Sequence, residues 1–302
     1  MPFETFVSKK IGNQILRTIL RLSRPIHLLL AALTFCLGAS IANYLGKPFR
    51  VDSFWFGLAA VILAQMSMSL LSEVFRLDAE PLSENETRRE RSVLRNNALY
   101  ISISALTANA VIAFLLFNNK HLSFSGFVYI LLSLLLILAF SLPPFRNRGF
   151  GEFILSAHLA YVIPSLGYLL QADNVHRFLI LLLPLTLLAF AYFIVMDFPA
   201  FATDRKFGRT TLLTQLGWER VVPLHNIFIL FAYIFLALSP FLGLSLSLIW
   251  PAFLTLPFAI FQIFQLRNIA LGAPANWILL TATALSVFGL TTYFLTLTFW
   301  LR

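Results

Sequence analysis

The sequence has few charged residues and several long stretches with none. Of its 302 residues only 12% are charged and 59% are hydrophobic, and the mean hydropathy is +0.84. This composition excludes a soluble globular domain, because too little polar surface is available to face water. A helix needs about 20 apolar residues to cross a membrane. We therefore expect an all-α, polytopic membrane protein, with residues 1–302 forming a single domain and no separate soluble part.

Disulfide, signal-peptide and nucleic-acid interpretations find no support. The single cysteine, Cys36, lies in an apolar run and can form no disulfide within the chain. Residues 1–25 form a basic amphipathic segment, expected in the cytoplasm, without the small-residue cleavage site of a signal peptide. The net charge of +9 does not imply nucleic-acid binding, because cytoplasmic loops of membrane proteins normally carry an excess of basic residues.

Nine apolar runs are long enough to cross a membrane, separated by charged residues, proline or glycine. They are residues 26–45, 53–75, 98–117, 124–142, 152–171, 178–196, 222–243, 244–266 and 277–300. The boundary between the seventh and eighth runs is the weakest, since Pro240 and Gly243 offer a turn but no charge marks it. An odd number of crossings places the two termini on opposite sides of the membrane.

The basic residues gather on one side of these segments. Seventeen of the 22 Lys and Arg residues fall on the N-terminal side of the membrane and five on the other. Because cytoplasmic loops carry more Lys and Arg, we expect a cytoplasmic N-terminus and an external C-terminus. Most of the acidic residues share the cytoplasmic side and form two clusters, 73–90 after the second segment and 197–204 after the sixth.

The first acidic cluster follows a polar stripe in the second segment. The residues of this stripe recur at helical spacing and must face protein or water. They are Gln65, Ser69, Ser72 and Arg76. Glu73 and Glu80 lie seven residues apart, near one face of the same helix, with Arg76 between them.

The second cluster surrounds a proline that ends or kinks the sixth segment. Pro199 biases Phe198 away from helical dihedral angles, which leaves Asp197 at the mouth of a membrane cavity. Asp204 follows seven residues later, with three basic residues close behind it: Arg205, Lys206 and Arg209. Because two cations follow Asp204 at once and can occupy its carboxylate, we expect the loss of Asp197 to matter more.

Carboxylates from two helix ends, with cations nearby, are the groups that bind a magnesium diphosphate. Mg²⁺ commonly takes one or two carboxylates plus phosphate oxygens, whereas Arg and Lys neutralise the remaining phosphate charge. The alternative is that charges near helix ends reach the membrane interface and report only topology. Four isolated polar residues in the segments are interpreted as hydrogen-bond partners between helices rather than as ligands: Asn109, His158, His225 and Asn226.

Three stretches carry recognisable motifs. They are residues 197–217 (DFPAFATDRKFGRTTLLTQLG), 141–152 (SLPPFRNRGFGE) and 20–38 (LRLSRPIHLLLAALTFCLG). Together with nine helices they resemble the UbiA superfamily of intramembrane prenyltransferases, nearest to its menaquinone and archaeal lipid branches. The stretches are similar to the second aspartate-rich motif with its tail, to the SxPPxR segment and to the first helix with its RP entry. The resemblance implies helices around a central cavity that opens to lipid.

The resemblance also implies a reaction and a set of site residues. Members of the family bind an isoprenyl diphosphate through Mg²⁺ held by two aspartate-rich motifs and transfer the prenyl group to an aromatic or other lipid-associated acceptor. The implied metal ligands are Glu73, Glu80, Asp197 and Asp204. The implied diphosphate-binding residues are Ser72, Arg146, Arg205 and Lys206. The implied catalytic residues are Asp197, Asp204 and Arg76.

The motifs depart from the family pattern. The middle aspartate of the second motif is Ala200, and the tyrosine before the SxPP segment is Phe140. Where the first motif has Asn-Asp and two further aspartates, the chain has Ser72, Glu73, Arg76 and Glu80. A guanidinium group cannot ligate Mg²⁺, although it can bind a phosphate through two hydrogen bonds. Either Arg76 substitutes for a metal ion, or the site no longer ionises a diphosphate.

Two functions of different classes remain open. The first is an enzyme that transfers a polyprenyl group from its diphosphate to a small, lipid-soluble or aromatic acceptor. The second is a catalytically silent isoprenoid-binding or assembly homologue, which the partial loss of both motifs favours. A secondary transporter is disfavoured, because the sequence shows no internal repeat with paired broken helices.

Overall fold

The computed structural model describes residues 17–76, 82, 87–142 and 149–302, and every regular element within these ranges is helical. Nine helical segments in this part of the chain are long and apolar enough to cross a membrane. They are Pro25–Tyr44, Val51–Val74, Arg88–Asn118, Phe124–Ser141, Gly151–Leu169, Arg177–Phe207, Trp218–Leu242, Leu246–Ala270 and Trp277–Leu301. The predicted all-α, multi-pass membrane fold is confirmed.

The first four spans are single helices: α2 (Pro25–Tyr44), α3 (Val51–Val74), α4 (Arg88–Asn118) and α5 (Phe124–Ser141). The fifth comprises α7 (Gly151–Ala157), the π-helical turn η1 (His158–Val162) and α8 (Ile163–Leu169). The sixth comprises η2 (Arg177–Leu181), α9 (Leu182–Asp197), η3 (Phe198–Ala200) and α10 (Phe201–Phe207). The short helix α11 (Leu212–Leu216) follows, and the seventh span comprises α12 (Trp218–Leu238) and η4 (Ser239–Leu242). The eighth comprises α13 (Leu246–Ile249), η5 (Trp250–Thr255) and α14 (Leu256–Ala270). The ninth comprises α15 (Trp277–Leu285), η6 (Ser286–Leu290) and α16 (Thr291–Leu301).

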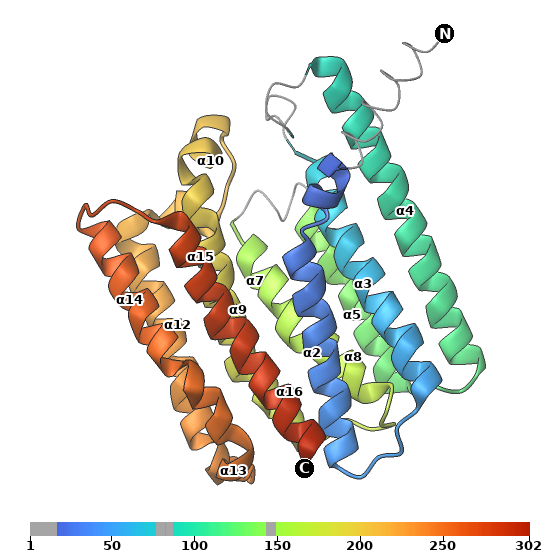
Figure 1. The fold of residues 1–302 in the computed structure, drawn as a ribbon. Coiled ribbons are helices and arrows are strands. Elements are labelled where there is room, and N and C mark those ends of the chain that lie inside the picture. The colour runs from blue at the N-terminus through green and yellow to red at the C-terminus, as the bar shows by residue number, and fades with distance from the viewer. Residues whose placement is uncertain (1–16, 77–81, 83–86, 143–148) are drawn as a thin grey trace, which may run out of the picture.

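The spans stand side by side in one bundle (Figure 1). α2 begins at the end of the bundle where α3 and α9 finish, and α10 and the start of α4 lie at this same end. We call it the motif end, because both acidic clusters lie there. The chain finishes with α16 at the opposite end, which we call the far end.

α2 occupies a central place in the bundle, packing against α3, α8 and α16. Its contact with α8 brings the two backbones together. A Cβ atom added at Gly38 would lie 1.8 Å from the carbonyl oxygen of Pro164, and one added at Gly167 would lie 2.2 Å from that of Phe35. Small residues allow such close approach between membrane helices, where dispersion contacts between closely packed surfaces drive association. The two glycines therefore fix α2 against α8, and with it the position of residues at the start of α2.

The polar stripe of α3 faces the protein interior, as predicted. Gln65, Ser69 and Ser72 are each at most 2% exposed. His158 of η1 joins this stripe to α5, because its Nδ1 lies 3.2 Å from Gln65 Oε1 and its Nε2 lies 2.9 Å from Ser133 Oγ. The interpretation of His158 as a hydrogen-bond partner between helices is confirmed.

The other isolated polar residues behave differently from that interpretation. His225 Nδ1 lies 3.0 Å from Oδ1 of Asn226, the next residue in α12, so this pair does not join two helices. His225 Nε2 is buried and has no hydrogen-bond partner among the described residues. Asn109 of α4 forms no hydrogen bond with any residue of the described part of the chain, so the prediction for it is not borne out.

Candidate functional site: a charge cluster at the motif end

The sixth span changes its helical winding at Pro199. Phe198 keeps helical dihedral angles, with φ of −60° and ψ of −44°, so the expectation that Pro199 moves it away from them is wrong. α9 ends at Asp197, three residues of 3₁₀ helix follow, and α10 begins at Phe201. Pro199 has no backbone N–H to continue the α-helical hydrogen bonds, so the chain changes its winding at this point. Asp197 is left half-buried at the end of a membrane-spanning helix.

Asp204 of α10 is paired with Arg209, which follows the end of the helix. α10 ends at Phe207, and Gly208 adopts a left-handed conformation with φ of 69° that reverses the chain. The N–H of Arg209 then donates to the Asp204 carbonyl oxygen at 2.8 Å, and its guanidinium Nη1 lies 3.5 Å from Asp204 Oδ1. The expectation that the next two cations occupy Asp204 is wrong, because the helix end brings back the fifth residue instead.

Glu73 in the last turn of α3 is only 2% exposed and is held by two guanidinium groups. Arg76, three residues further on, places Nε 2.6 Å from Oε2. Arg24 comes from the start of α2 and places Nη2 3.2 Å from Oε1. A buried carboxylate needs such partners, because an unpaired charge out of water is costly. Both oxygens of Glu73 are therefore engaged with arginine.

Arg24 has an unusual backbone conformation. It precedes Pro25, the first residue of α2, with φ of 53° and ψ of 72°, in the left-handed region that non-glycine residues seldom occupy. Three residues on, the ring of His27 packs against the rings of Tyr192 and Phe193 in α9, at centroid distances of 6.0 and 5.2 Å. The start of α2 thus lies against α9 as well as α3.

Asp197 lies beside a second carboxyl group, that of Glu152 in the first turn of α7. Glu152 is 5% exposed, and its Oε1 accepts a hydrogen bond of 2.8 Å from the N–H of Leu212. Its Oε2 is buried and receives no hydrogen bond from a donor among the described residues. The two carboxyl groups lie near enough to interact electrostatically, and Arg209 and Arg24 also lie near enough to act on Asp197. Two adjacent carboxylates repel, so a cation between them is favoured.

These residues form one network across four membrane spans. Arg24 acts on Glu73 and Asp197, and Arg209 acts on Asp197 and Asp204. We define the charge cluster as Arg24, Glu73, Arg76, Glu152, Asp197, Asp204 and Arg209. The segments that carry the two predicted motifs therefore meet through arginines rather than through direct contact of their carboxylates.

The remaining predicted residues have different surroundings. Ser72 is buried and its hydroxyl donates to the Ser69 carbonyl oxygen at 2.7 Å. Arg205 and Lys206 are exposed, and the Lys206 ammonium lies 5.5 Å from the centre of the Phe207 ring. Neither of these two cations forms an ion pair with any residue that the structure describes. Glu80 and Arg146 lie outside the described residues.

Three members of the charge cluster were not predicted as site residues: Arg24, Glu152 and Arg209. Arg209 was noted in the sequence only as a cation close behind Asp204. Arg24 and Glu152 appear in the sequence only within segments that resemble the family, outside both acidic clusters. Topology supplies a signal for both, because the starts of the first and fifth segments lie on the same side of the membrane as the ends of the second and sixth. A search for charges at every segment boundary on that side finds both residues.

The described residues fit Mg²⁺ on only one side of the cluster. They contain no group of three or more His, Cys, Asp or Glu residues able to hold a metal ion. Glu73 does not fit, because two guanidinium groups already engage its oxygens. Asp197 and Glu152 do fit, since Mg²⁺ commonly takes one or two carboxylates and completes its shell with water and phosphate oxygens.

The sequence matches the UbiA prenyltransferase family over residues 31–284, and the chain belongs to this family. No curated protein sequence matches it. The family membership and the bundle of spans agree with the resemblance found in the motifs.

Solved structures share the fold at low sequence identity. A structure described for digeranylgeranylglyceryl phosphate synthase has 16% identity and a TM-score of 0.64, covering 95% of this chain and 98% of its own. A UbiA homologue from Archaeoglobus fulgidus bound to DMAPP and Mg²⁺ has 16% identity and a TM-score of 0.56, covering 92% and 99%. An apo UbiA homologue from Aeropyrum pernix K1 has 14% identity and a TM-score of 0.55, covering 87% and 96%.

Proposed function

We propose that this protein is a prenyltransferase that binds a polyprenyl diphosphate at the charge cluster and transfers the prenyl group to a lipid-soluble, aromatic acceptor. One observation carries the proposal. Arg24 and Arg209 act on an adjacent pair of carboxyl groups at the ends of membrane spans, and Arg76 joins Arg24 through their shared partner Glu73. At such a place a diphosphate can meet water while its prenyl chain stays in lipid. The bound DMAPP and Mg²⁺ of the A. fulgidus homologue support the choice of ligand.

The chemistry requires stabilisation of a departing anion. The bond between C1 of the prenyl group and the diphosphate oxygen breaks, and the electron pair leaves with the diphosphate. The allylic carbon is then attacked by a nucleophilic atom of the acceptor, which loses a proton as the new bond forms. Fixed positive groups near the leaving oxygens lower the barrier, because they are already oriented where negative charge develops. Arg24 and Arg76 are held in this way by Glu73.

Asp197 and Glu152 are the residues that would hold Mg²⁺. When bound, the ion would neutralise diphosphate oxygens and make the diphosphate a better leaving group. The arginines on the Glu73 side supply positive charge that does not depend on metal, and they donate charge-assisted hydrogen bonds that suit phosphate oxygens. We therefore expect diphosphate binding to be strengthened by Mg²⁺ but not to depend on it completely.

A catalytically silent isoprenoid-binding homologue is the second candidate. The observation that favours it is the engagement of Glu73 by two arginines, which removes one carboxylate from metal binding. On that account the prenyl diphosphate binds but its C1–O bond stays intact.

Diphosphate release separates the two candidates. The purified protein is incubated with farnesyl or geranylgeranyl diphosphate and Mg²⁺, with and without candidate aromatic acceptors. We expect release that depends on both acceptor and Mg²⁺ and falls at least about tenfold in an Asp197→Asn variant. Binding without release from any pair would support the silent homologue, and absence of binding would contradict both candidates.

A further inference from the structure

A large cavity lies away from the charge cluster. It has a volume of about 740 Å³ and is enclosed by α3, α4, α5 and α8, between Gly57 and Ala64 on α3. This stretch of α3 precedes Glu73 by at least nine residues, which places it about 14 Å or more along the helix, at 1.5 Å per residue, toward the far end. The volume is within the usual range of cavities that bind small molecules, about 300 to 1,000 Å³. We call it the α4–α5 pocket.

The lining of the α4–α5 pocket is almost entirely apolar. No charged side chain occurs among the described residues that form it. Its polar members are Asn109, Ser123 and Ser133, and the Ser123 hydroxyl is already used as the N-cap of α5. Such a lining excludes phosphate, diphosphate and carboxylate groups, because nothing in it compensates a buried charge.

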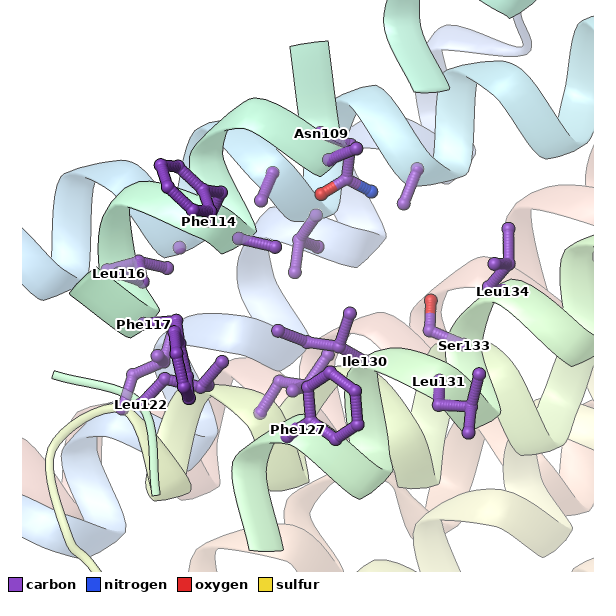
Figure 2. A pocket seen from close by; sticks show the side chains of 18 of the residues that line it. Asn109, Phe114, Leu116, Phe117, Leu122, Phe127, Ile130, Leu131, Ser133 and Leu134 are labelled. Atoms are coloured by element: carbon purple, nitrogen blue, oxygen red, sulfur yellow. The ribbon is translucent and has the colours of Figure 1, made fainter. Parts of the chain in front are cut away.

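Asn109 and Ser133 face the pocket from opposite helices. Figure 2 shows the carboxamide of Asn109 on α4 and the hydroxyl of Ser133 on α5 directed into the space between the two helices. The Ser133 hydroxyl forms a hydrogen bond with Nε2 of His158, and Nδ1 of the same ring forms one with Gln65. Asn109 has no hydrogen-bond partner within the described part of the chain. The pocket thus presents one fixed hydroxyl and one unpartnered amide.

Asn109 lies deep in the membrane, where an amide without a hydrogen-bond partner is costly in free energy. It lies nine residues before the end of α4 at Asn118, about 14 Å along the helix axis at 1.5 Å per residue and so near the middle of a hydrocarbon layer about 30 Å thick. Polar groups at this depth have no water to bond and are characteristic of functional sites. Because the side chain points between α4 and α5, it is not placed to pair with a second copy of the protein.

We propose that the α4–α5 pocket binds a neutral lipid with a long hydrocarbon or isoprenoid chain and one hydroxyl or carbonyl group, which Asn109 and Ser133 bind through hydrogen bonds. The amide offers both a donor and an acceptor, so it satisfies either group. A phospholipid phosphate does not fit beside these two residues, because nothing in the lining compensates its charge. The site is separate from the charge cluster and does not rest on the proposed transfer reaction.

Photolabelling of the full chain in phosphatidylcholine nanodiscs tests the proposal. The probe is a long-chain isoprenoid alcohol with a diazirine in its tail, and labelled peptides are identified by mass spectrometry. Ala113→Trp fills the pocket, and Ala108→Trp is the matched control, because Ala108 is exposed on the same helix and does not line the pocket. Asn109→Leu removes the amide while keeping a similar volume, and thermal unfolding checks that each variant is folded.

We expect label on the parts of α4 and α5 that line the pocket, lost in Ala113→Trp and retained in Ala108→Trp. Asn109→Leu should lower labelling about fivefold, the effect of losing one ordinary hydrogen bond. Unlabelled prenol, a prenylquinone and diacylglycerol are added separately, and the strongest competitor identifies the source of the neutral lipid. The proposal is overturned if Ala113→Trp labels as well as wild type, if a probe without the hydroxyl labels equally, or if phosphatidylglycerol or a prenyl diphosphate competes as well as the prenol.

Discussion

Arg24 stands between two carboxylates that belong to different helices. Its guanidinium group is paired with Glu73 of α3 and lies near enough to Asp197 of α9 to act on its charge. The left-handed backbone at this residue is a conformation of higher energy, which persists only where the surroundings enforce it. Packing of α2 and the ion pair with Glu73 supply that enforcement. Arg24 is thus fixed in place before any ligand arrives.

Replacing Arg24 tests its role in diphosphate binding. In Arg24→Gln, Glu73 keeps its pair with Arg76, but one positive charge is lost from the centre of the cluster. We expect the affinity for geranylgeranyl diphosphate to fall at least about tenfold, both with Mg²⁺ and with EDTA, the effect of losing one charge-assisted hydrogen bond. Arg220→Gln, an exposed arginine at the start of α12, is the control and should bind as wild type. Equal affinity of the two variants for geranylgeranyl diphosphate would show that Arg24 does not bind the diphosphate.

The pair of Asp197 and Glu152 makes a prediction about metal and stability. Glu152→Gln preserves an oxygen to accept the hydrogen bond from Leu212 and offers an N–H to Asp197 in place of a second carboxyl group. Without metal the variant should be more stable than wild type by about 1 kcal/mol, the scale of one hydrogen bond. Mg²⁺ should raise the unfolding temperature of wild type but not of the variant. Thermal unfolding in detergent with Mg²⁺ and with EDTA measures both effects, and an equal response to Mg²⁺ in the two proteins would place the ion elsewhere.

At the scale of elements, the contact between α2 and α8 determines where Arg24 lies. Gly38→Ala places a Cβ atom 1.8 Å from a backbone oxygen of the neighbouring helix, so the two helices must move apart. We expect a loss of at least about 1 to 3 kcal/mol in stability, as in other overpacked interiors, together with weaker diphosphate binding. Gly289→Ala is the matched control, since its Cβ atom would make only ordinary contacts at 3.5 Å and beyond. Equal unfolding temperatures for the two variants would contradict this account of the helix contact.

The elements also show what the sequence can and cannot predict. The nine spans and the change of winding at Pro199 follow from local rules, because hydropathy and proline act on the residues that carry them. The pairing of Asp204 with Arg209 depends on the left-handed turn at Gly208, and sequence spacing alone points to nearer cations instead. The pairing of Glu73 with Arg24 joins residues 49 positions apart. Such contacts depend on how helices pack, which a pattern within one segment does not contain.

At the scale of the whole molecule, the orientation in the membrane remains a prediction from the distribution of Lys and Arg. It places the motif end in the cytoplasm. In a background with Cys36 replaced by Ala, we expect Lys120→Cys at the far end to react with a membrane-impermeant maleimide on intact cells. Glu219→Cys at the motif end should react only after the membrane is opened. Labelling of Glu219→Cys on intact cells would show that the protein has the opposite orientation.

The central claim is that arginine side chains take over part of the metal's role at the charge cluster, and Arg76→Asp addresses it most directly. The measurement is a titration of a fluorescent geranylgeranyl diphosphate analogue against wild type and the variant, each with Mg²⁺ and with EDTA. The account predicts that wild type binds in EDTA and binds more tightly with Mg²⁺. In the variant, binding in EDTA should fall at least about tenfold, because one phosphate-binding cation becomes a carboxylate, and the dependence on Mg²⁺ should increase. Identical binding by the two proteins in both conditions would contradict the claim and place residue 76 outside the site.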